Sequence, residues 1–179
     1  MANEVLIKSD TPIVWADTTD YAGDIGARTH QILLAALATT AARQGAKADL
    51  GATRAAVYAV TMAIEWDVAP TAGDVCSLWW AASPSGTAAT ANPGGCTGED
   101  AAYAGTAGDS LADSIMQLTL IGNLVCTTDD APVVQFQTFM FSPEHRYGSP
   151  VVWNEAGQAL EGDDIEMGIA FTPIIDESQ

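Results

Sequence analysis

Basic residues are scarce in this chain. Its 179 residues include only six Lys and Arg against 23 Asp and Glu, which gives a formal net charge of −17. Nucleic acids are bound mainly through Lys and Arg that contact phosphates, and anionic membrane surfaces attract the same side chains. The composition therefore predicts that neither a nucleic acid nor a membrane is a partner.

Long apolar runs are also missing. No run approaches the ~20 residues that a transmembrane helix needs, and the first eight residues lack a basic segment followed by an apolar core. We therefore expect synthesis in a cytoplasm without a signal peptide. The hydrophobic content of 48% is nevertheless too high for a disordered acidic tail. The length fits one domain of roughly 100–200 residues, so we predict a single domain over residues 1–179.

Sequence motifs of catalysis and cofactor binding are absent as well. The three cysteines (Cys76, Cys96 and Cys126) are widely spaced, and they form neither a CxxC pair nor a cluster with histidine. The chain contains no GxSxG, GxxxxGK[ST] or GxGxxG motif. These absences predict a protein that is not an enzyme and that uses no cofactor.

Alternation of apolar with small or acidic residues is the strongest pattern that is present. It is clearest over residues 58–68, where every second residue is bulky and apolar, as in a half-buried strand. Residues 75–82 form the next expected strand, and a turn at Pro70 predicts that the two make an antiparallel hairpin. Further strands are expected over 114–126, 133–141, 149–153 and 165–172, the last ending at Pro173.

Two segments lack such alternation. Residues 1–27 have no strong periodicity and are interpreted as an extended N-terminal docking segment, whereas residues 85–113 are interpreted as one long surface loop with a helical turn near Leu111. Residues 32–37 fit either a strand or a short helix. The whole pattern predicts an all-β fold, an antiparallel β-sandwich, with a jelly roll as the preferred topology.

Acidic residues offer two candidate sites. Glu65 and Asp67 lie on one face of the first strand; we interpret them as its solvated end, and the alternative is the paired acids of a hydrolase. Residues 161–166 contain several carboxylates that could hold Ca²⁺, although they lack the spacing of an EF-hand. An ordinary acidic turn is the preferred interpretation of this segment.

Aromatic and basic residues provide candidates for an interface. Trp79 and Trp80 are adjacent in a strand and must point to opposite faces, so one belongs to the core and the other is exposed or covered by a second chain. Tyr147 and Trp153 could likewise belong to the core or lie at a surface that is exposed or covered by a second chain. Four of the six cations fall within 27 residues, and they either pair with nearby acids or form a patch that docks on an acidic neighbour such as another copy. These cations are Arg28, Arg43, Lys47 and Arg54.

Two stretches, within residues 48–84 and 141–177, resemble virion structural proteins of tailed bacteriophages, especially marine ones. The first stretch runs from residues 48–56 through the long strand to residues 69–73 and then includes 79–84, and the second consists of residues 141–143, 146–159 and 171–177. This resemblance implies a small β-sandwich on the capsid surface, a decoration or cement protein that binds the major capsid protein and is made in the host cytoplasm. A homotrimer or another symmetric homo-oligomer would cover exposed sheet edges.

Two other functions remain as alternatives. A protein of the same fold could belong to the tail or the tail tip. A carbohydrate-binding module, which is a different class of protein, would use Trp79 or Trp80 together with Trp153 to stack on sugars.

Overall fold

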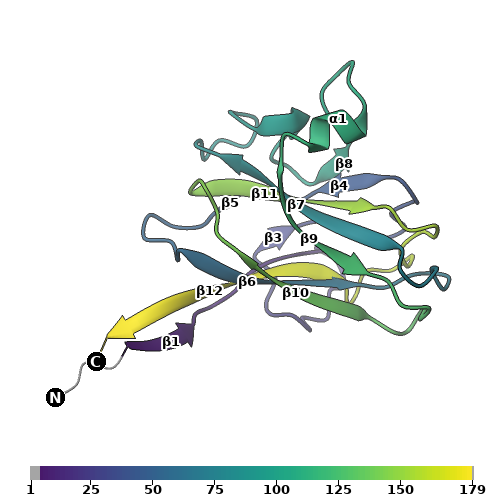
Figure 1. Ribbon diagram of the computed structural model, residues 1–179, viewed down its shortest axis with the longest axis horizontal. Coiled ribbons are helices and arrows are strands. Elements are labelled where there is room, and N and C mark those ends of the chain that lie inside the picture. The colour runs from purple at the N-terminus through teal and green to yellow at the C-terminus, as the bar shows by residue number, and fades with distance from the viewer. Residues whose placement is uncertain (1–4, 179) are drawn as a thin grey trace.

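Two β-sheets packed face to face make up the protein, whose computed structural model describes residues 5–178 (Figure 1). The first sheet has the order β10 (Gln135–Phe141), β6 (Val57–Ile64), β12 (Gly168–Ser178), β2 (Ile13–Ala16) and β3 (His30–Gln31), with β1 (Val5–Ser9) paired to β12. The second sheet has the order β8 (Ala101–Tyr103), β4 (Ala42–Gln44), β11 (Tyr147–Asn154), β7 (Val75–Ser83) and β9 (Thr119–Val125), with β5 (Ala48–Asp49) paired to β11. The β2–β3 pair is parallel and the other pairs are antiparallel. This arrangement confirms the all-β sandwich; the jelly-roll topology stays a prediction.

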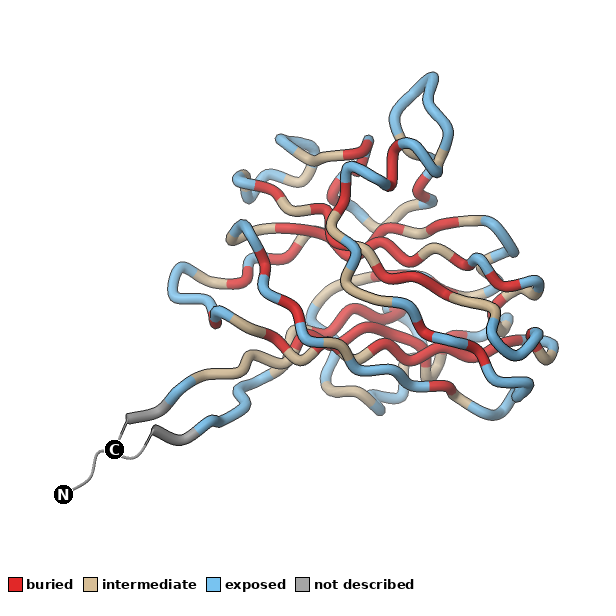
Figure 2. The backbone as a smooth tube through the Cα atoms, viewed as in Figure 1, coloured by how far each residue is buried: buried red, intermediate tan, exposed pale blue. Residues whose placement is uncertain are grey.

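Buried residues are concentrated in the strands of the two sheets (Figure 2), and aromatic rings fill the space between these sheets. The ring of Phe171 lies 5.0 Å from that of Trp15 and 5.0 Å from that of Trp80, and all three side chains are fully buried. Tilted and edge-on ring pairs of this kind add about 0.5–1.5 kcal/mol each beyond the burial of their apolar area. The predicted alternation is confirmed on β6, because Tyr58 and Met62 point into this core.

A second, smaller core lies on the outer face of the second sheet. It contains Ile115, Leu118 and Tyr103, which cover Ala81 and Val151 of the sheet. Residues 85–113 are therefore not the long surface loop that the sequence predicted. They contain the 3₁₀ helix η1 (Pro93–Gly95), strand β8 and the start of helix α1 (Leu111–Ile115), and together these form a partial third layer. Among the described residues, no helix is long and apolar enough to span a membrane.

The predicted hairpin between residues 58–68 and 75–82 is wrong. Strand β6 belongs to the first sheet and β7 to the second, so the connection between them crosses from one layer to the other. The predicted alternation is interrupted in β9. Leu78 of β7 pairs with Gly122 of β9, but the next residue, Trp79, pairs with Leu120, so Ile121 has no partner in the register. Leu120 consequently points outward. Gly122 then faces Phe139 of β10, whose ring would lie 2.2 Å from any Cβ at this position.

The two ends of the described chain form a ribbon that projects from the sandwich (Figure 1). Strand β12 does not end at Pro173 as predicted but continues to residue 178, and β1 pairs with this extension. Within the segment predicted to dock, residues 1–4 lie outside the described residues, and residues 13–16 are a buried inner strand instead. Only residues 5–9 of this segment extend along the ribbon. Residues 32–37 form neither a strand nor a helix.

Candidate functional site

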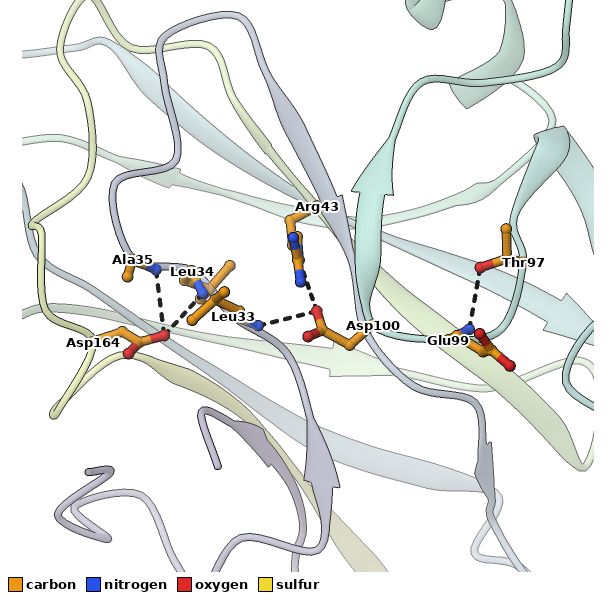
Figure 3. A network of polar contacts seen from close by, with 8 residues as sticks. All are labelled: Leu33, Leu34, Ala35, Arg43, Thr97, Glu99, Asp100 and Asp164. Atoms are coloured by element: carbon orange, nitrogen blue, oxygen red, sulfur yellow. Dashed lines mark hydrogen bonds and ion pairs between the residues drawn. The ribbon is translucent and has the colours of Figure 1, made fainter. Parts of the chain in front are cut away.

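Carboxylates gather where residues 161–167 approach residues 17–20 at one end of the sandwich. Asp164 is 3% exposed, and its Oδ2 accepts hydrogen bonds from the amides of Leu34 (3.0 Å) and Ala35 (3.3 Å), as Figure 3 shows. Asp17 is 5% exposed, and its Oδ2 accepts a bond of 2.7 Å from the amide of Thr19. These amides position both carboxylates although each is largely removed from water.

Asp20 completes a group of three acids with Asp17 and Asp164. One ligand oxygen from each lies within 4.8 Å of the others, beside an open hollow of about 440 Å³. Burial and the neighbouring carboxylates raise the pKa values of Asp20 and Asp164. Burial acts in the same direction on Asp17, but hydrogen bonds from backbone amides outweigh it and lower its pKa. Three such oxygens can share a proton or hold a hard cation such as Ca²⁺. The prediction for residues 161–166 thus included Asp164 but missed its two distant neighbours.

Glu65 lies in a separate acidic cleft of about 340 Å³. Its side chain is only 4% exposed and faces Glu161, Asp163 and Glu166. Burial, together with repulsion from Glu166 and the other carboxylates, raises the pKa of Glu65 to about 7. The interpretation of Glu65 as part of a solvated strand end is therefore wrong. Asp67 is exposed and does not line this cleft, so the two acids do not form the pair considered for a hydrolase.

Two of the four predicted docking cations are used within the chain. The Arg43 guanidinium forms an ion pair of 2.7 Å with Asp100, whose carboxylate also accepts from the Leu33 amide (Figure 3). The Lys47 ammonium donates to the Ser83 hydroxyl and to three carbonyl oxygens of residues 85–90, at 2.8–3.1 Å. Both contacts fix residues 83–100 against the second sheet. For Arg43, the simpler interpretation of pairing with a nearby acid is confirmed.

The other two cations face solvent. Arg28 lines a hollow that also contains Asp17, and Arg54 donates a hydrogen bond of 3.3 Å to the carbonyl of Glu144. The structure thus leaves two exposed cations, Arg28 and Arg54, from the proposed patch.

Most of the predicted aromatic surface is covered by the chain itself. Trp80 is fully buried in the main core and cannot contact a partner. Trp79 and Trp153 are half-buried against the second core, so the third layer partly covers side chains for which the sequence left open exposure or cover by a second chain. Tyr147 is half-buried beneath the guanidinium of Arg146, 5.0 Å from the ring centre. This arrangement removes Trp80 from the stacking platform that a carbohydrate-binding module would need.

Two of the exposed large apolar side chains of the described residues lie on β10, outside the predicted interface residues. Phe136 is 55% exposed and Met140 is 64% exposed. Residues 135–141 contain no charged residue, but longer uncharged runs occur over 75–98 and 114–128, so the sequence does not single out this strand.

No protein-family model matches this chain, and no match was found among curated proteins or solved structures.

Proposed function

We propose that the protein is a structural component of a tailed-bacteriophage virion, a capsid decoration protein that binds the major capsid lattice and stabilises it. The observation that carries this proposal is the projecting ribbon of β1 and the end of β12 (Figure 1). Together with the resemblance to virion proteins, it supports a role in docking on a larger assembly.

The ribbon has only two strands, so contact with another surface should stabilise it. Its two strands pair over five residues each, from Val5 opposite Ser178 to Ser9 opposite Ile174. An isolated two-stranded ribbon is marginally stable in water. Ile7 is 76% exposed on it, although its burial would contribute about 1.5–3 kcal/mol. A ribbon that lies on the capsid lattice would gain both packing and order.

The body of the molecule suits such a role. Its aromatic core gives a rigid sandwich, and the net charge of −17 opposes non-specific association of free copies. Contact with the lattice would then rely on apolar and hydrogen-bonding groups, such as the exposed Ile7 side chain and the backbones of the two ribbon strands.

The test is to add purified protein to particles that lack it and to measure both binding and the temperature at which the particles are disrupted. Ile7→Asp should weaken binding, because it replaces the exposed apolar side chain of the ribbon with a carboxylate opposite Asp176. Val68→Asp, at a position that is 50% exposed outside the ribbon, is the matched control and should bind as the wild type does. Wild-type protein that neither binds nor raises the disruption temperature would show that the proposal is wrong. Immunogold labelling of the tail alone would favour the tail alternative.

A further inference from the structure

Strand β10 is an unprotected sheet edge. It is the outermost strand of the first sheet, and in the described chain it pairs with β6 alone. Its seven residues, Gln-Phe-Gln-Thr-Phe-Met-Phe, contain no charge, proline or glycine. Natural proteins usually protect such edges with charged residues, proline, bulges or short strands, since a free edge recruits other strands.

Other edges of the two sheets show these protections. Strand β3 has two residues and β8 has three, which limits the number of backbone hydrogen bonds that either can offer. Strand β9 is as long as β10, but it carries the register shift opposite Leu78 and Trp79. A bulge of this kind twists an edge away from regular pairing. The free edge of β10 has neither of these protections, and at ~3.4 Å per residue it is about 24 Å long.

The outward face of β10 is apolar and continues onto a neutral sheet surface. Phe136 and Met140 flank Thr138, whose hydroxyl lies 3.2 Å from that of Thr61 on β6. Ala59 continues this face on β6 opposite Met140. In a chain with a net charge of −17, a surface formed by uncharged residues is one where two like-charged copies can meet without close repulsion.

We infer that β10 pairs antiparallel with β10 of a second copy, across a two-fold axis at Thr138, so that two first sheets join into one continuous sheet. A two-fold contact must be self-complementary, and this strand meets the requirement. With the axis at its central residue, Phe136 of each copy lies opposite Met140 of the other, an aromatic–thioether contact that is favourable. This interface is one case of the symmetric homo-oligomer predicted from the sequence, and it does not depend on a role in a virion.

A cysteine at the axis provides a register-specific test. Residues directly opposite in an antiparallel pair have Cα atoms about 4.5–5.5 Å apart, which is within the range that a disulfide spans. Thr138→Cys should therefore form a covalent dimer when oxidised glutathione is added. Gln137→Cys is the matched control, because residue 137 would lie opposite residue 139 and its two copies would be about 8 Å apart. The three native cysteines are buried, so wild-type protein should not cross-link.

Charge placed on the edge tests the same interface without a covalent bond. Sedimentation should give wild-type protein twice the monomer mass of 18.6 kDa, and Met140→Lys should lose this dimer. Met116→Lys adds the same charge at a methionine that is 73% exposed beside α1, and it should remain dimeric. Circular dichroism checks that both variants are folded. A monomeric wild-type protein would overturn the inference. A dimer that persists in folded Met140→Lys would also overturn it, as would a Thr138→Cys dimer that does not become covalent on oxidation. If wild-type protein is monomeric and β10 is covered only on particles, the partner is a strand of the lattice and not a second copy.

Discussion

Glu65 makes the stability of this protein depend on pH in the direction opposite to that of most carboxyl groups. Its pKa is raised from 4.5 to about 7 in the folded chain, first by burial and then by Glu166 and the other acids of the cleft. A raised pKa means that the folded state favours the protonated form. Its contribution is therefore fully present below pH 4.5 and is lost as the pH rises through about 7. Each pKa unit corresponds to about 1.4 kcal/mol, so the ionised group lowers the free energy of unfolding by about 3 kcal/mol.

Replacement of Glu65 with glutamine isolates this effect, because the amide has nearly the same shape and cannot ionise. Urea unfolding of wild type and Glu65→Gln should give similar free energies at pH 4.5. At pH 8.5 the variant should be more stable by about 3 kcal/mol. Asp67→Asn removes a carboxylate that is exposed and lies outside this cleft, and as the matched control it should not become more stable than wild type by a comparable amount at pH 8.5. A difference between Glu65→Gln and wild type that does not change with pH would refute the reasoning.

Two further predictions concern packing and internal hydrogen bonds. Gly122→Ala should lower the free energy of unfolding by about 1–3 kcal/mol, measured by urea titration, because its Cβ would lie 2.2 Å from the Phe139 ring; unchanged stability would show that these strands separate easily. Lys47→Met should cost about 1–3 kcal/mol and speed amide exchange over residues 83–90, since four oxygens lose their shared donor. Arg54→Met, which removes a single exposed hydrogen bond, is its control, and equal exchange in the two variants would contradict the role given to Lys47.

The regular strands could be predicted from the sequence because alternation is a local property. The strands predicted over 58–68 and 75–82 are found over 57–64 and 75–83, so the first ends earlier than predicted, and Tyr58 and Met62 are buried as expected. Which strands pair is not a local property, and the predicted hairpin between these two was wrong for that reason. The continuation of β12 beyond Pro173 also depends on a distant strand, since β1 supplies the pairing that residues 174–178 need.

The candidate sites were harder to predict for the same reason. Asp17 and Asp164 are 147 positions apart in the chain, and only the fold brings them together. The docking cations were chosen by their spacing, but Lys47 is held by carbonyl oxygens, which carry no signal in the sequence. Trp79 was correctly placed on the face opposite Trp80, whereas its cover by residues 93–118 required knowledge of the third layer.

Cryo-electron microscopy of virions that contain the protein tests the proposed function most directly. We predict density for the sandwich on the outer surface of the capsid, with the ribbon of β1 and β12 in contact with the major capsid protein. Density for this protein only in the tail, or a capsid contact that leaves the ribbon in solvent, would contradict the proposal.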